Sequence, residues 1–140
     1  MTAAVQSFVF CDSVVIDAQS NKAIVQGIFD RVTAQSYPAM HGQCSIFIRL
    51  ALAPGESTCS LSLRLRSPAG DEVSLIESQK VSATGPLGVV QTIINLQGLP
   101  LPIAGNYAFL LLVDDESASS FAFEALQMGN QNAPAGRSMH

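Results

Sequence analysis

Side chains able to do acid–base or nucleophilic chemistry are sparse in this sequence. The only histidines are His41 and His140, and His140 is the last residue, so a histidine-based catalytic triad has one candidate base. Asp12, Asp17 or Asp30 could orient His41, and serines are plentiful, but no segment resembles the motif around a nucleophilic serine. The sequence therefore predicts a protein that is not an enzyme and has no catalytic residue.

Candidate metal ligands are equally scattered. The three cysteines lack the paired Cys-x-x-Cys spacing that is typical of zinc sites. The acidic cluster 114–116, with Asp17 or Asp71 from neighbouring loops, could supply the carboxylate oxygens that calcium prefers. Solvated turn residues are the commoner use of such acids, so we expect no metal site and no cofactor.

An aromatic and three arginines form a candidate binding patch for an anion or a protein partner. The patch consists of Phe47, Arg49, Arg64 and Arg66. Alternation places the three arginines on the outer face of two neighbouring strands, where guanidinium groups could bind a carboxylate or phosphate. The alternative is an ordinary sheet exterior in which Glu72 lies opposite Arg66 as a solvated ion pair.

These residues must be positioned by β-strands, because apolar residues alternate with a period of two along much of the chain. We predict strands over residues 5–16, 22–33 and 89–97, an irregular crossing between sheets over 34–42, and a loop around Gly85-Pro86. The proline-rich segment 98–102 is predicted to be a connector that does not pair continuously.

The clearest pattern spans residues 44–65, which we predict to be a β-hairpin. Placing Ala53 opposite Thr58 sets Leu52 against Cys59 and continues that pairing along both strands. Cys44 and Cys59 then lie at opposite ends of the hairpin, too far apart for a disulfide, and are predicted to be buried thiols.

The segment 105–115, GNYAFLLLVDD, is predicted to be a central strand because both of its faces are apolar. A final strand is expected to return with Phe121 opposite Val113 and Phe123 opposite Leu111. That pairing leaves apolar residues on the outer face, which must be covered. A second subunit or another protein is the favoured cover, and the alternative is a segment of the chain itself, either the proline-rich connector or the C-terminal tail. The candidate interface residues are Leu110, Leu112, Ala122 and Leu126, beside Ala108.

Composition narrows the class of protein. The chain has 140 residues, 48% hydrophobic and 13% charged, with a mean hydropathy of +0.31. We expect one antiparallel β-sandwich domain over 1–128, of seven to eight strands, immunoglobulin-like or jelly-roll, and a flexible tail over 129–140. The net charge of −4 argues against nucleic acid, and no segment predicts a membrane span or a signal peptide. A cytoplasmic protein with free thiols is expected.

Four segments together resemble a known family. They are GIFDRV, PAMHGQCSIFIRLALAPGE, LRLRSPAGDEV and LPLPIAGNYAFLLLVDDE. From about Phe8 to Phe123 the chain is similar to short bacterial proteins classed only as a domain of unknown function. The resemblance implies a β-sandwich and no catalytic residue. Where such families often have Asp-Gly at the final hairpin, this chain has Asp114-Asp115, so a tight two-residue turn is not expected there.

Two functions remain open from the sequence. The first is a non-enzymatic structural or protein-interaction module that self-associates, as a homo-oligomer, or docks in a larger bacterial or phage assembly; the apolar outer face and the low charge favour it. The second is a small-ligand or carbohydrate-binding module. Sugar sites usually use exposed aromatic side chains, and the chain has no tryptophan and only Tyr37 and Tyr107, which favours the first function.

Overall fold

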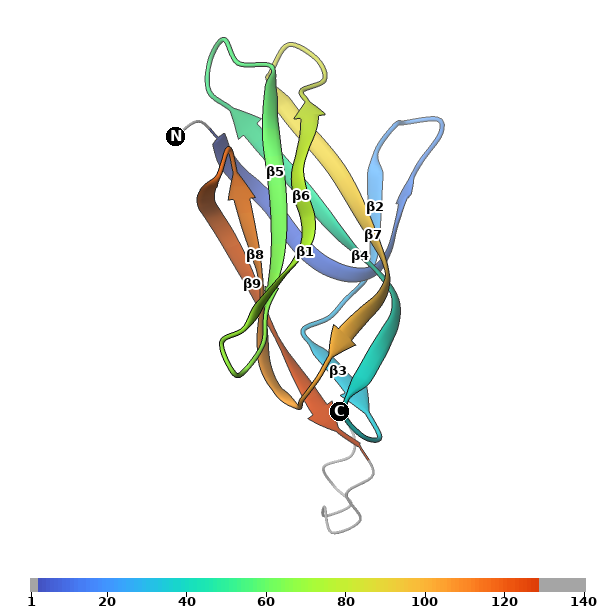
Figure 1. Cartoon of the computed structure of the whole chain (residues 1–140). Coiled ribbons are helices and arrows are strands. Elements are labelled where there is room, and N and C mark those ends of the chain that lie inside the picture. The colour runs from blue at the N-terminus through green and yellow to red at the C-terminus, as the bar shows by residue number, and fades with distance from the viewer. Residues whose placement is uncertain (1–2, 129–140) are drawn as a thin grey trace.

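The computed structural model describes residues 3–128, which fold into nine strands arranged in two sheets (Figure 1). The predicted tail, residues 129–140, lies outside the described residues. Within 3–128 there is no helix, and so none long or apolar enough to cross a membrane. The strands are β1 (Ala3–Ile16), β2 (Ala23–Ile28), β3 (Arg31–Ala34), β4 (Ala39–Leu52), β5 (Thr58–Arg66), β6 (Glu72–Ser82), β7 (Val89–Leu101), β8 (Gly105–Val113) and β9 (Glu116–Gln127).

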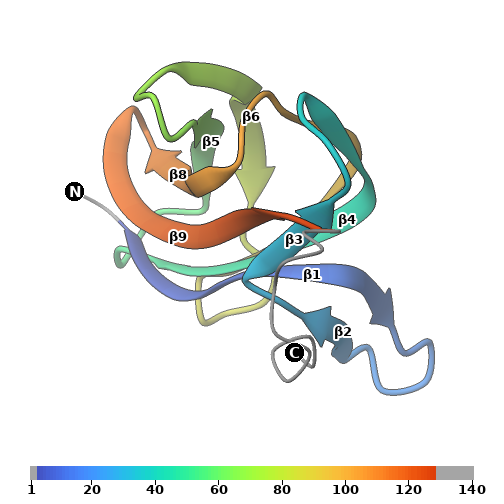
Figure 2. The ribbon, with the colours of Figure 1, turned by 90° about the horizontal axis from the view of Figure 1, so that it is seen from below.

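The order of strands defines an immunoglobulin-like sandwich. One sheet has the order β2-β1-β4-β7 and the other β3-β9-β8-β5-β6, and all pairings are antiparallel except that of β3 with β9. The connections β2 to β3, β3 to β4, β4 to β5, β6 to β7 and β7 to β8 each cross from one sheet to the other. Figure 2, seen from below, shows β5 and β8 on one side of the molecule and β1 and β2 on the other. These Greek-key crossings match the immunoglobulin arrangement, so the predicted all-β sandwich is confirmed, and of the two predicted topologies it is the immunoglobulin-like one. Residues 3–128 form nine strands where seven to eight were predicted, because the segment 22–33 makes two strands, the second of which pairs in parallel.

The predicted hairpin of residues 44–65 is wrong, because its two strands belong to different sheets. β4 pairs with β1 and β7, whereas β5 pairs with β6 and β8. Ile48 and Leu63 lie in one core cluster, each with 0% exposure, so the two strands contribute their buried faces from opposite sheets. An alternating pattern is the same for strands side by side in a sheet and for strands facing each other across a core.

The predicted strand 22–33 is divided at Phe29 and Asp30. β2 extends the first sheet, and the chain then crosses to the second sheet as β3. The chain crosses back to the first sheet between β3 and β4, so the crossing predicted over 34–42 is present, although only residues 35–38 lie outside strands. The crossing from β2 to β3 is an additional one that was not predicted. Gly27, two residues before this division, has a φ of +72°, and a Cβ there would lie 2.3 Å from Asp12 Oδ2.

Strand β7 continues through the segment that was predicted to be a connector. Its pairing with β4 runs to Leu101, which lies opposite Ala39, and includes Pro100 opposite Met40. β7 is the end strand of its sheet, so the missing N–H of Pro100 is tolerated on the side without a partner strand.

The turn between β8 and β9 sets a register that differs from the predicted one. Asp114 and Asp115 form a two-residue turn with φ values of 52° and 67°, contrary to the expectation from the missing Asp-Gly. The turn alone would place Phe121 opposite Ala108, but a β-bulge near Leu111 and Leu112 shifts the register by one residue. Phe121 therefore lies opposite Phe109, and Phe123 opposite Tyr107. The offset from the prediction is an even number of residues, so the side chains keep the faces that were assigned to them.

The core lies between the two sheets and is rich in aromatic rings. Phe10, from the first sheet, packs with its ring centroid 4.8 Å from that of Phe109 and 5.1 Å from that of Phe123. Tyr107 stacks on Phe123 at 5.3 Å, and Leu111 is fully buried. The inward face of the central strand β8 is thus as predicted, and β8 lies between β9 and β5.

Candidate interaction site

An apolar strip lies on the outer face of the five-stranded sheet. It consists of Ala108, Leu110, Leu112 and Ala122, which we call the outer strip. Ala108 lies opposite Ala122 on β9, and the leucines are half-buried while the side chains between them on β8 are buried. Leu126, the remaining predicted interface residue, lies on the same face farther along β9, beside Thr33 of β3. The structure therefore brings the predicted interface residues onto one face.

The residues that border the outer strip are polar or charged. Leu110 has Ser120 as its neighbour on β9 and Arg64 on β5, and Ala108 has Arg66 on β5. Leu112 has Ser117 and the buried Ser62 as neighbours. An apolar centre within a polar border that includes arginine is the anatomy of a protein–protein interface.

The predicted patch of Phe47 with three arginines is divided between the two sheets. Arg64 and Arg66 lie on β5, and both contact Glu72, at 3.7 and 3.4 Å. Phe47 and Arg49 lie on β4 in the other sheet. The patch is therefore not a single binding surface, because it depended on β4 and β5 being neighbours.

The two halves of that predicted patch have different local partners. Arg49 donates hydrogen bonds to the side-chain oxygens of Gln6 at 2.9 Å and Gln91 at 2.8 Å, and Phe47 is only 8% exposed. Arg64 and Arg66 share one carboxylate and remain 43% and 49% exposed, so these ion pairs contribute little to stability. Both arginines are thus available at the border of the outer strip.

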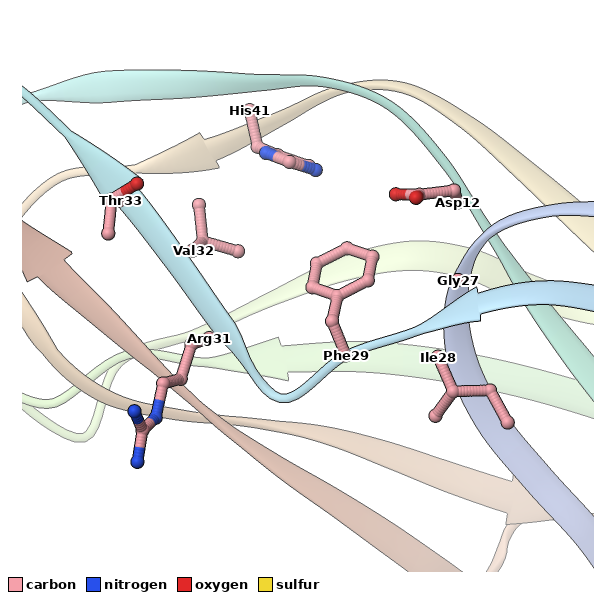
Figure 3. A pocket seen from close by; sticks show the side chains of 8 residues that line it. All are labelled: Asp12, Gly27, Ile28, Phe29, Arg31, Val32, Thr33 and His41. Atoms are coloured by element: carbon pink, nitrogen blue, oxygen red, sulfur yellow. The ribbon is translucent and has the colours of Figure 1, made fainter. Parts of the chain in front are cut away.

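A polar pocket of about 350 Å³ lies where the chain crosses from β2 to β3. His41 and Asp12 point toward one another there, whereas the guanidinium of Arg31 points away (Figure 3). Nε2 of His41 is buried without a hydrogen-bond partner, and burial lowers the pKa of His41 although the charge of Asp12 opposes that shift. Of the three aspartates considered as partners of His41, the structure places Asp12 in the pocket.

Two of the acidic residues considered as calcium ligands, Asp17 and Asp114, form hydrogen bonds in turns. The Asp17 carboxylate accepts hydrogen bonds from the Ser20 hydroxyl at 2.8 Å and the Gln19 N–H at 3.1 Å, and these bonds lower its pKa. Asp114 Oδ1 accepts the N–H of Ser60 at 2.9 Å. Among residues 3–128, no group of three or more histidine, cysteine or acidic side chains is placed to hold a metal ion.

The cysteines are buried free thiols within the described chain. Cys44 is 2% exposed and Cys59 5%, as predicted. Burial is the main cause that raises the pKa of each thiol, to about 11 for Cys44. A thiolate at neutral pH is therefore disfavoured, and a role in redox chemistry or metal binding is not supported.

An apolar groove of about 340 Å³ lies between the two sheets where β4 begins and β7 ends. Its walls come from the start of β4, the end of β7 and the β5–β6 hairpin, and they include Leu65, Val73, Pro100, Leu101 and Tyr107. We call this the end groove. It was not foreseen from the sequence, because it forms between strands of different sheets.

The position of β7 at the edge of its sheet is a second feature that the sequence did not predict. Between Lys80 and Asp114 the sequence has no charged residue, and β7 lies inside this run. The opposite sheet ends in β6, whose edge carries Glu72, Glu77 and Lys80. The uncharged run was visible in the sequence, but only the sheet order shows that it forms an edge.

The strand order and the two surfaces define an immunoglobulin-like β-sandwich module with an apolar sheet face. The chain belongs to the family of unknown function DUF6941, whose model matches residues 6–125. This confirms the resemblance to a domain of unknown function. None of the curated proteins matches the sequence.

Solved structures resemble the chain in fold only. An alkylpurine DNA glycosylase of Pseudomonas fluorescens, solved bound to DNA with an abasic site analogue, aligns with a TM-score of 0.55 and 8% identity, over 88% of this chain and 30% of that one. The Lin-41 filamin domain aligns at a TM-score of 0.38 and 21% identity, over 84% and 92%. An immunoglobulin-like protein of Pseudomonas aeruginosa aligns at 0.42 and 12%, over 88% and 95%.

Proposed function

We propose that this protein is a non-enzymatic interaction module that docks in a larger protein assembly through the outer strip. The observation that carries the proposal is the position of Leu110 and Leu112 on the outer face of the central strand β8. A sandwich buries one face of each sheet, so leucines on the other face have no role in the core.

The chemistry of the border supports a protein as the partner. Arg64 and Arg66 lie next to the outer strip, so a partner with an apolar centre and acidic residues at its border would fit. Burying the two leucines fully would contribute about 1 kcal/mol each, because they are already half-buried in the free protein.

The test uses a photo-crosslinking amino acid at position 112 and, as a control, at position 15. Val15 is apolar and 47% exposed, but it lies on β1 in the other sheet. We expect protein adducts from position 112 that position 15 does not give. Leu112→Glu should abolish the association without unfolding the protein, whereas Val15→Glu should not. Equal adducts from both positions would reject the outer strip as the docking surface.

A small-ligand function is the second candidate, and the end groove is the observation that favours it. The groove is lined mainly by apolar side chains and has a volume in the range of small-molecule sites. A carbohydrate is not favoured, because the Tyr107 hydroxyl bonds to Ile103 and the Tyr37 hydroxyl donates to the Leu126 carbonyl at 2.7 Å. Saturable binding of an apolar dye that Val73→Asp abolishes would support this function.

A further inference from the structure

We infer that β7 is a self-association edge, where two copies of the chain pair their β7 strands antiparallel across a two-fold axis. The pairing would join the two four-stranded sheets into one continuous sheet. The inference deepens the proposed interaction function and rests on it, but it uses a different surface from the outer strip.

Most of β7 lacks the usual protection of an edge strand, since Gly98, with a φ of +105°, and Pro100 interrupt only its C-terminal end. It runs for 13 residues at the end of its sheet and contains no charged side chain. Proteins commonly protect such edges with lysine, bulges or short strands, because the unpaired N–H and C=O groups otherwise recruit another strand. β6 shows this protection: it carries Glu77 and Lys80, and its pairing with β5 is irregular near Ser78, which has a φ of 47°.

The segment of β7 that is open to pairing is limited at both ends. At one end, the Val89 carbonyl already accepts the Thr84 N–H at 3.0 Å. At the other end, Pro100 has no N–H to offer. The available edge is therefore centred near Ile94 and Asn95.

A second copy of this chain is the favoured partner for the β7 edge, because β7 carries no charge. Antiparallel pairing about a two-fold axis brings residues near the axis opposite their own copies, so a charged residue there would face a like charge. No such residue exists in β7. The side chains that it exposes include Gln91, Asn95 and Gln97, which are uncharged and so tolerate an identical copy opposite them. The side-chain oxygens of Gln91 and Asn95 already accept hydrogen bonds from Arg49 and Ser45, so main-chain pairing would hold the two strands together.

The test combines solution mass with amide hydrogen exchange. The dimer dissociation constant is measured by light scattering for the wild type and for Asn95→Lys, which places two lysines near the axis. We expect Asn95→Lys to raise that constant about fivefold or more. In the wild type, exchange of β7 amides should slow as protein concentration rises, whereas exchange of β6 amides should not change.

Two variants serve as controls. Asn95→Val loses the same hydrogen bond, from the Ser45 hydroxyl at 2.7 Å, without adding a charge, and should remain dimeric. Gln79→Lys adds the same charge to an exposed position on β6 and should also remain dimeric. Thermal melting of all variants confirms that they are folded.

The outcomes separate this inference from the proposed function. A dimer that Asn95→Lys weakens and Leu112→Glu leaves intact supports pairing through β7. A dimer weakened only by Leu112→Glu, or a β7 exchange rate that does not depend on concentration, overturns the inference while docking through the outer strip stands. A wild-type monomer at every concentration also overturns it, and the crosslinking test at position 112 then decides the proposed function separately.

Discussion

The phenol of Tyr107 bonds twice to the backbone of Ile103. Its hydroxyl donates to the Ile103 carbonyl and accepts the Ile103 N–H at 3.1 Å. Tyr107 lies near the start of β8 and is 2% exposed, so the bonds join the segment before β8 to the core. This arrangement corresponds to the tyrosine corner of immunoglobulin-like sandwiches, where a buried tyrosine bonds to the backbone a few residues upstream.

Tyr107→Phe removes both hydrogen bonds and leaves the ring in place. We expect the free energy of unfolding to fall by about 1–2 kcal/mol, which urea denaturation followed by circular dichroism would measure. Tyr37→Phe, which loses a single bond at a half-buried site, should cost less. Equal unfolding midpoints for Tyr107→Phe and the wild type would show that the corner does not contribute to stability.

Gly27→Ala combines backbone strain with a steric clash. Gly27 has a φ of +72°, and the new Cβ would lie 2.3 Å from Asp12 Oδ2, so we expect a loss of about 2 kcal/mol or more. Gly55→Ala is the matched control, because its φ is +86° but no atom lies within 4 Å of the added Cβ. If both variants lose the same stability in urea, the contact with Asp12 is not the cause.

Asp115→Gly should stabilise the β8–β9 hairpin. Asp115 has a φ of 67° in a two-residue turn, a conformation that glycine adopts without steric cost, and we expect a gain of about 0.5–1 kcal/mol. Asp114→Gly should gain less, because it removes the acceptor for the Ser60 N–H. Thermal melting of both variants compares their stabilities with that of the wild type. An unchanged midpoint for Asp115→Gly would show that the positive φ of Asp115 does not strain the hairpin.

Stability should fall in acid because of His41. Burial lowers the pKa of His41 in the folded protein below its ordinary value of 6.5, so the unfolded state binds more protons near that pH. The free energy of unfolding is therefore highest above pH 6.5 and decreases as the pH falls through that value. Urea denaturation from pH 8 to 5.5 measures this slope, which His41→Gln should reduce. A slope that is the same in His41→Gln and the wild type would show that His41 is not its source.

The three thiols should react only when the protein unfolds. Burial raises the pKa of Cys44 to about 11 and also raises those of Cys11 and Cys59. We expect an aromatic disulfide reagent at pH 8 to label none of them in native protein and all three in urea. Stoichiometric labelling of one thiol in the native protein would show a local opening near that cysteine.

Much of the fold was predictable because alternation of apolar side chains is a local property. Tyr107, Phe109 and Leu111 are buried as their spacing indicates, and the central position of β8 follows from its two apolar faces. The same spacing placed Leu110, Leu112 and Ala122 on the outer face. The sequence by itself therefore determined the all-β class, the inward faces of β4, β5 and β8, and the outward position of the residues proposed as an interface.

Only the tertiary structure decided which strands are neighbours. Ile48 and Leu63 would be buried whether β4 and β5 paired as a hairpin or faced each other across the core. The alternating pattern therefore did not show that these two strands belong to different sheets. That one choice separated Arg49 from Arg64, and placed β7 at the edge of its sheet. Alternation specifies which side chains avoid water, whereas strand pairing depends on how all nine strands close around a single core.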